Sequence, residues 1–306
     1  MVKYLLRRLL LILPTVWIAV TIIFVIFRLV PGDPAELIAG EMAPREVVQA
    51  IRAQMGLDQP MHIQYVRYLG GLLRGDLGVS KVYGARVLDQ LLLRFPATLE
   101  LAIAAMLIAF IVGLTAGIIS ATRYNSLFDY LSMLGAIAGV CVPAFWLGLM
   151  LILFFSVGLG WLPSTGRGGL RTLVLPAVTL SAYQMAVIAR MTRSSMLEVI
   201  QQDYIRTARA KGLAEWAVIY GHALKNALIP TITIAGLQFG FLLGGSIVVE
   251  SVFAWPGLGS LMIDSIRHRD YTMVQGTAVL YTTVCLLINL LVDLVYSALD
   301  PRVRYG

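Results

Sequence analysis

Charged residues are scarce in this chain, and that scarcity is the first constraint on its class. Asp, Glu, Lys and Arg make up 13% of the 306 residues, whereas apolar types make up 58%. Soluble domains carry about 25% charged residues. Because the apolar residues also gather in long runs, the composition predicts a membrane protein. The net charge of +7 is then a signal of topology and not of nucleic-acid binding.

The residues that carry most enzyme chemistry are also sparse. The two cysteines, Cys141 and Cys285, sit inside apolar runs and form no disulfide framework or metal-binding spacing. The three histidines fall in three different loops. No H-E-x-x-H, G-x-x-x-x-G-K-[ST] or G-x-S-x-G motif occurs, and no span contains paired acids. The sequence therefore predicts no enzyme, no metal site and no nucleotide held by this chain itself.

What the chain has in abundance is apolar runs near the ~20 residues that a helix needs to cross a bilayer. The predicted spans are Leu9–Val30, Leu99–Ala121, Tyr130–Leu159, Leu173–Met191, Ile229–Val249 and Met273–Ala298. The first follows three cations, as a signal peptide would, but is too long and lacks a cleavage site, so we expect a retained span. The third is long and contains Pro143, which predicts a kink or a split. We expect an all-α polytopic membrane protein with about six transmembrane helices.

Cations in the short loops predict the orientation of the chain. One side holds most of them: Lys3, Arg7, Arg8, Arg123, Arg190, Arg193, Arg206, Arg209, Lys211, Lys225, Arg302 and Arg304. The opposite short loops hold only Arg167, Arg171, Arg267 and Arg269. The positive-inside rule therefore places both termini in the cytoplasm.

The long loop 31–97 has balanced charge, and its sequence predicts structure. The stretch "PREVVQAIRAQMGL" starts with Pro44, ends at Gly56 and has apolar residues at helical spacing. The stretch "QPMHIQYVRYLGGLLRGDLG" resembles a second amphipathic helix that ends in glycines. We expect a small helical region outside the membrane, within one membrane domain that spans residues 1–306.

The most unusual segment is 194–228, which includes "DYIRTARAKGLAEWAVIYGHALKN". Asp203 is positioned to cap a short basic helix, and Gly212 to end it. Ala208 and Ala210 keep one side of that helix small. Pro230 fits the first turn of the next span.

Two interpretations of this segment remain open. A basic amphipathic helix can lie on anionic headgroups. Alternatively, the small residues and the glycine break suit close docking of another protein.

A few polar residues and glycines lie near or within the predicted spans. Glu250 either lines or gates a path through the membrane, or it has a structural role at the interface, where it caps or pairs with an arginine such as Arg267. Glu100 is expected to open the second span, where the helix dipole favours a carboxylate. Gln238, Gly244 and Gly245 lie in "GLQFGFLLGGS", which is typical of a closely packed or moving helix.

The basic segment resembles the cytoplasmic coupling loop of bacterial ABC importer permeases. Their pattern is E-A-A-x-x-x-G, nine residues, then I-x-L-P, and Ala208, Gly212 and Leu224 match it. Four positions depart from the general pattern: Arg206, Thr207, His222 and Lys225. These departures resemble the peptide-importer branch. Further motifs similar to that branch are "PGDP" at 31–34, "GDLG" at 75–78, "ARMTRSSMLEV" at 189–199, "FAWPGLG" at 253–259, "RDY" at 269–271 and "DPRVRYG" at 300–306.

The resemblance covers almost the whole chain and implies a type I permease fold in the bacterial inner membrane. It implies a second homologous permease, two ATP-binding subunits that hold ATP and Mg²⁺, and a periplasmic or lipoprotein substrate-binding protein. Lipid surrounds such a chain, and no nucleic acid is involved. The cargo would be a dipeptide, an oligopeptide or glutathione, with a nickel complex as the alternative in the same family. An ion-coupled secondary transporter is the competing class, which would need ion-binding residues near the midplane.

By this similarity, segment 194–228 is the coupling loop and 31–97 a periplasmic helical loop. The residues expected to contact an ATPase subunit are Arg206, Thr207, Ala208, Arg209, Ala210, Lys211, Gly212 and Leu213. The residues expected at the path or its gate are Glu250, Gln238, Gly244 and Gly245.

Overall fold

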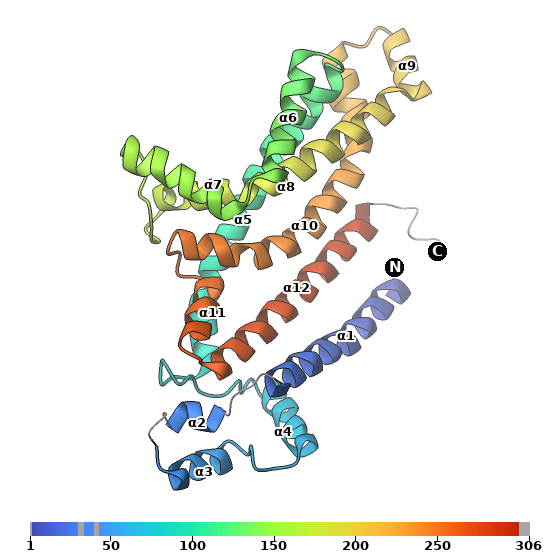
Figure 1. Cartoon of the computed structure of the whole chain (residues 1–306). Helices are drawn as coiled ribbons and strands as arrows, with labels where there is room; N and C mark the ends of the chain where they lie inside the picture. Colours follow the sequence, from blue (N-terminus) through green and yellow to red (C-terminus); the bar gives the residue numbers. More distant parts are fainter. Residues whose placement is uncertain (1, 30–33, 40–42, 300–306) are drawn as a thin grey trace.

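The computed structural model describes residues 2–29, 34–39 and 43–299, and within them every extended element is a helix (Figure 1). The N-terminal half contains α1 (Val2–Leu29), α2 (Pro34–Ala39), α3 (Arg45–Gln54), α4 (Met61–Leu73), α5 (Val87–Thr122), α6 (Leu127–Cys141), α7 (Ala144–Leu151) and the π-helical η1 (Ile152–Gly158). The C-terminal half contains α8 (Leu170–Ile200), α9 (Asp203–Ala210), the π-helical η2 (Ala217–Ala223), α10 (Leu224–Val252), α11 (Leu258–Arg267) and α12 (Tyr271–Leu299). The all-α prediction is confirmed. The motifs at 31–34 and 300–306 lie wholly or mostly outside the described residues.

The number of apolar helices agrees with the predicted spans. Within the described residues, five helices are long and apolar enough to cross a membrane, and α6 with α7–η1 forms a sixth if the bent pair counts as one span. That pair bends by 107° between Cys141 and Ala144, where Pro143 precedes the first residue of α7. Proline lacks an N–H donor and pushes the residue before it out of the α region. The break expected at Pro143 is therefore present.

Helices α5 and α8 pack closely along each other, because glycines on α5 allow their backbones to approach. A Cβ built on Gly113 would lie 2.7 Å from the Met185 carbonyl oxygen, and one on Gly117 would lie 2.7 Å from that of Ala189. Close approach at small residues is the usual basis of helix association in membranes. At one end of this pair, Arg193 on α8 binds both carboxylate oxygens of Asp129 on α6, at 2.8 and 2.9 Å.

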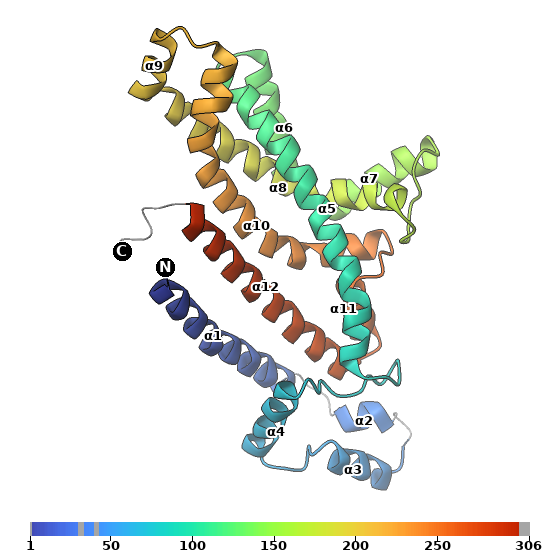
Figure 2. The ribbon, with the colours of Figure 1, turned by 180° about the vertical axis from the view of Figure 1, so that it is seen from behind.

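The short helices gather at opposite ends of the long ones. Figures 1 and 2 both place α2, α3 and α4 beyond the C-terminal end of α1, and α9 at the far end of α8 and α10. The expected helix after Pro44 is α3, and it ends two residues before Gly56. Below, the region formed by α2, α3 and α4 is called the cap.

The expected position of Glu100 at a helix start is wrong. Helix α5 begins at Val87 and continues through Pro96, so Glu100 lies well inside it. Its carboxylate binds the Arg167 guanidinium at 2.5 Å. Polar residues such as Asp89 and Arg94 lower the hydropathy of the first turns of α5, and a count of apolar residues therefore places the start too late.

Candidate coupling surface and central cavity

The basic segment folds as a short helix followed by a sharp turn. Helix α9 begins after Gln202, and no side chain caps its start. The expected cap by Asp203 is therefore wrong: Asp203 is the first residue of the helix, its carboxylate is exposed, and it lies 3.7 Å from the Arg206 guanidinium. A carboxylate in the first turn still interacts favourably with the helix dipole.

Gly212 turns the chain after α9. Its φ of +74° is in the left-handed region that favours glycine. The Gly212 N–H donates to the Arg209 carbonyl at 2.9 Å, and the Lys211 N–H donates to the Thr207 carbonyl at 3.0 Å. These bonds satisfy the last carbonyls of the helix, as in other glycine-ended helices. The helix therefore ends where the sequence predicts.

Helix α9 has one face packed against its own chain. Ile205 and Ala208 are buried, and they pack with Met196 on α8 and with Val218 and Ile219 on η2. Ala208 is only 6% exposed, so its small side chain serves packing inside this chain. Among the other predicted coupling residues, Arg206, Thr207, Arg209, Ala210, Lys211, Gly212 and Leu213 are exposed.

Next to the exposed cations lies an exposed apolar edge. Leu213 is 42% exposed, Trp216 72% and Tyr220 57%. Arg209 bridges to the start of this edge, because its Nη2 donates to Glu215 Oε1 at 2.8 Å. The same hydrogen bonds hold the pKa of the Glu215 carboxyl below its usual value. We call the exposed residues of α9, Gly212, Leu213, Trp216 and Tyr220 the coupling surface. Cations beside unpartnered aromatic rings are typical of protein-binding surfaces.

The expected position of Pro230 is wrong. Helix α10 begins at Leu224, directly after the π-helical η2, and Pro230 lies inside it. Membrane helices tolerate an internal proline because neighbouring groups can satisfy the freed backbone carbonyl. The segment 217–252 is thus one continuous helical segment that runs from the coupling surface into the centre of the molecule.

Helix α10 lines a cavity of about 480 Å³ beside the bend between α6 and α7. Its lining consists of Gly139, Val140, Val142, Pro143, Ala144, Leu147, Thr179, Leu180, Ala182, Tyr183, Gln184, Gln238, Phe241, Leu242 and Gly245. None of these described lining residues is charged. We call this space the central cavity.

Two of the four predicted path residues, Gln238 and Gly245, line the central cavity. Gly244 is exposed, and Glu250 is buried elsewhere. The structure adds a residue that the sequence reasoning missed: Gln184 on α8, whose Oε1 accepts a 2.6 Å hydrogen bond from Gln238 Nε2. An amide inside an apolar span is itself a signal of function or helix pairing, so Gln184 could have been found.

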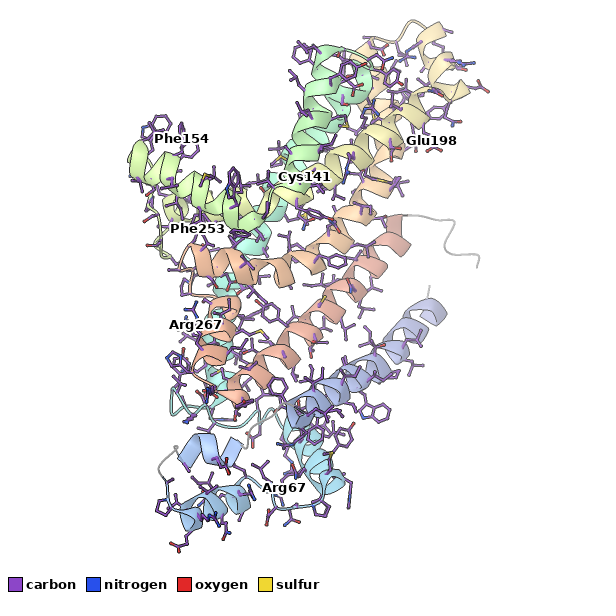
Figure 3. All side chains as sticks on the ribbon, in the orientation of Figure 1. Arg67, Cys141, Phe154, Glu198, Phe253 and Arg267 are labelled. Carbon is purple, nitrogen blue, oxygen red and sulfur yellow. The ribbon has the colours of Figure 1, made fainter. Side chains whose placement is uncertain are left out.

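Glu250 is fully buried at the corner between α10 and α11. One carboxylate oxygen accepts the N–H groups of Gly259 at 2.7 Å and Ser260 at 3.1 Å, and the other accepts the Thr98 hydroxyl at 2.7 Å. Arg267 lies at the opposite end of α11 (Figure 3), so the expected pairing with it is wrong. The carboxylate instead holds the start of α11 against α5, as the helix-capping alternative predicted.

Among the described residues, no group of three or more His, Cys, Asp or Glu side chains could hold a metal ion. The described residues do offer an exposed surface of cations and aromatic rings and a cavity with an uncharged lining.

Comparison with known proteins assigns the chain to a family. The family described as "Binding-protein-dependent transport system inner membrane component" matches residues 113–305, and the corresponding N-terminal family matches residues 1–102. The chain is 48% identical over 305 residues to the glutathione transport system permease protein GsiC of Escherichia coli strain K12, covering 100% of both chains. The same protein from Salmonella paratyphi A is also 48% identical over 305 residues.

Solved structures agree on the fold. The MetNI methionine ABC transporter in an inward-facing conformation matches with a TM-score of 0.59 and 23% identity, over 69% of this chain and 96% of that chain. An amino acid ABC transporter matches with a TM-score of 0.55 and 17% identity, over 69% of this chain and 94% of that chain. At these identities the likeness shows the fold of an ABC importer permease.

Proposed function

Because this chain belongs to the inner membrane components of binding-protein-dependent transport systems, we propose that it is the first permease of a pair in an ATP-driven importer of peptides. The observation that carries the proposal is the 48% identity over the whole chain to a glutathione permease. The cargo is then a dipeptide, an oligopeptide or glutathione. Energy comes from separate subunits, since the sequence contains no phosphate-binding loop.

The proposed assembly has four kinds of component. This chain and a second homologous permease enclose the path, two ATPase subunits bind ATP and Mg²⁺, and an external binding protein delivers cargo. Both termini are placed in the cytoplasm by the positive-inside rule. In Figure 1 the start of α1 points toward the same end of the molecule as α9, which supports that orientation.

The coupling surface is the proposed contact with an ATPase subunit. Arg206, Arg209 and Lys211 present positive charge there, and Trp216 adds an exposed ring. Ala208 does not reach this surface itself, but its buried side chain packs α9 against η2 and so supports the exposed residues. A movement of the ATPase would therefore reach α8 and α10 through the packed side chains that hold α9 against α8 and η2. Coupling of this kind needs contacts that differ between two states of the complex.

The lining of the central cavity is compatible with the passage of a zwitterionic cargo. Its described lining is apolar except for Thr179, Tyr183, Gln184 and Gln238. A fixed charge in a poorly hydrated path would bind one end of a peptide tightly, and a neutral amide would bind it weakly. Weak contacts let cargo leave as well as enter.

The experiment is copurification combined with transport. The tagged chain is extracted from its own membrane in mild detergent, its companions are identified by mass spectrometry, and vesicles are tested for ATP-dependent uptake of labelled glutathione. A second sample carries Lys211→Glu with Trp216→Glu. A matched control carries Arg45→Glu with Met61→Glu, two exposed positions in the cap. We expect phosphate-loop ATPases with the wild type and the control, and their loss from the coupling-surface variant.

The other outcomes separate the alternatives. Retention of the ATPases by the coupling-surface variant would return α9 to the headgroup-binding interpretation. Uptake of nickel complexes in place of glutathione would move the cargo to the nickel branch. Glutathione uptake without ATP or copurified ATPases would favour an ion-coupled secondary transporter and overturn the proposal.

A further inference from the structure

A second cavity, of about 250 Å³, lies where the outer end of α1 meets α4 and the turn before α12. Its lining includes Arg28 on α1, Gln64, Arg67 and Tyr68 on α4, and Arg269 before α12. Figure 3 shows Arg67 within the cap, far along the molecule from Glu198 near the end of α8. The lining of this outer cavity shares no residue with the central cavity or with the coupling surface, so it is a separate site.

Three buried polar atoms without a hydrogen-bond partner converge on the outer cavity: Arg28 Nε, Gln64 Oε1 and the Tyr68 hydroxyl. Gln64 is oriented by its other amide atom, because Nε2 donates to the Gln59 carbonyl at 2.8 Å. The Tyr68 hydroxyl lies near Gln275 without a hydrogen bond of standard geometry. Buried polar groups are normally paired because leaving them unpaired is unfavourable, so the cavity needs an occupant with both acceptors and a donor.

The charges around the outer cavity favour an anion. Four cations line it: Arg28, Arg67, Lys81 and Arg269. Two acids also line it, but their oxygens hold nearby backbone. Asp76 accepts the Gly78 N–H at 2.9 Å. Asp270 accepts the N–H groups of Val82 and Met273, each at 3.1 Å. The guanidinium groups thus outweigh the acids as ligands for an incoming group.

The position of the outer cavity at the end of α1 indicates the kind of anion. Arg28 lies in the last turn of α1, a helix apolar enough to span a membrane, and its guanidinium stacks on the Phe24 ring with 5.2 Å to the centroid. Large apolar residues on the same part of α1 are exposed: Ile22, Val25, Ile26 and Leu29. An arginine at the end of a lipid-facing span lies at the level of the headgroups, where phosphates are abundant. Guanidinium groups bind phosphate through paired hydrogen bonds.

We propose that the outer cavity binds a phosphoglycerol group, with Arg28 and Arg67 on the phosphate and Gln64 Oε1 accepting a glycerol hydroxyl. The Tyr68 hydroxyl donates to the phosphate as well. Burial raises the pKa of Tyr68 to about 12, so its hydroxyl keeps its proton at neutral pH. The phosphoglycerol group has two sources: the headgroup of phosphatidylglycerol, or a soluble glycerol phosphate. The exposed apolar face of α1 favours the lipid.

The test measures thermal unfolding of the chain with the subunits that accompany it, after depletion of lipid in detergent. Phosphatidylglycerol, phosphatidylcholine with the same acyl chains, glycerol 3-phosphate and acetate are added separately at equal ionic strength. A ligand that binds only the folded state raises Tm with its concentration. We expect phosphatidylglycerol to raise Tm more than phosphatidylcholine or acetate does.

Two variants and one control assign the effect to the cavity. Arg28→Gln should raise the half-maximal lipid concentration at least about tenfold, because a charged hydrogen bond is lost. Tyr68→Phe removes a buried hydroxyl that has no partner, so it should keep or slightly raise the Tm of the unliganded protein and raise that concentration about threefold. Arg74→Gln, at an exposed arginine directly after α4 and outside the cavity lining, should behave as the wild type. If Arg28→Gln does not fold, Tyr68→Phe decides.

A response to phosphatidylglycerol alone assigns the lipid source, and an equal response to glycerol 3-phosphate assigns a soluble source. Equal responses to phosphatidylcholine or acetate would overturn the proposal. So would an equal loss in Arg74→Gln, or no response at all, since the cavity would then hold water alone.

Discussion

At the scale of single residues, the Glu250 carboxylate organises the corner between α10 and α11. It gathers donors from two backbone N–H groups and Thr98, while the Trp255 indole N–H donates to the Ala97 carbonyl at 2.8 Å. The turn that contains Gly257 passes directly over this carboxylate. A Cβ built on Gly257 would lie 2.5 Å from its carboxyl carbon. The "FAWPGLG" stretch therefore packs directly against a buried acid, and its glycines leave room for the carboxyl group.

We expect Glu250→Ala to destabilise the protein by about 3 kcal/mol or more, because it leaves buried donors unpaired. Glu250→Gln should cost less, since its amide oxygen still accepts hydrogen bonds. The measurement is the Tm of the purified complex. Asp58→Ala, at an exposed acid of the cap, is the control. Equal Tm values for Glu250→Ala and Asp58→Ala would contradict the role given to the carboxylate.

Gln184 and Gln238 present neutral amides to the central cavity. If cargo passes there, Gln238→Leu should lower the rate of ATP-driven glutathione uptake about fivefold, the equivalent of one lost hydrogen bond. ATP hydrolysis by the complex should change less. Gln54→Leu, at an exposed position of α3, is the matched control. Unchanged uptake in Gln238→Leu would leave this amide pair a helix–helix contact only.

At the scale of elements, the contact between α5 and α8 depends on the absence of side chains at Gly113 and Gly117. Gly117→Ala should destabilise the protein, because overpacking costs about 1–3 kcal/mol and the gain in helix propensity returns only about 1 kcal/mol. Gly135→Ala on α6 is the matched control, since a Cβ there meets nothing within 4 Å. Thermal unfolding of both variants in parallel measures the difference. A lower Tm for Gly135→Ala than for Gly117→Ala would refute this account.

The junction of α9 and η2 should respond to acid through Arg209 and Glu215. The pKa of Glu215 is lowered in the folded state by its hydrogen bonds to Arg209. The ion pair therefore contributes stability above the unfolded pKa of about 4.3, and this contribution is lost as pH falls through the folded value. Both side chains are largely exposed, so water screening keeps the effect small.

Hydrogen exchange measures that response. After correction for intrinsic rates, exchange of amides in 205–219 should increase no more than a few-fold between pH 6 and pH 3. Glu215→Gln should show the faster exchange already at pH 6 and little further change. A wild-type response that persists in Glu215→Gln would assign it to another group.

At the scale of the whole molecule, hydropathy predicts the number of spans because the bilayer fixes a length that apolar residues must cover. The bend at Pro143 is predictable as well, since proline acts on the local backbone. The ends of the helices are harder to predict from the sequence. α5 starts in a stretch where Asp89 and Arg94 interrupt the apolar residues, and α10 continues through Pro230 because the helix before it supplies the preceding turn.

The candidate sites are predicted only in part, and the reason is long-range packing. Sequence spacing places Ala208 on the basic helix but does not reveal that its methyl group faces Met196 and Val218. Likewise, the partners of Glu250 are backbone N–H groups of a later turn and a hydroxyl from α5, which no motif displays. Gln238 and Gly245 were predicted at the path, and they share a cavity because the bend between α6 and α7 opens one beside α10.

The uncharged lining of the central cavity also bears on how such importers diversify. If cargo passes through this cavity, its described residues impose no requirement on the sign of the charge on that cargo, and a change of nutrient would then demand little change in this subunit. Natural selection can then act mainly on the gene for the external receptor. A bacterium that acquires a different receptor gene would gain a new diet while inheriting this membrane chain almost unaltered.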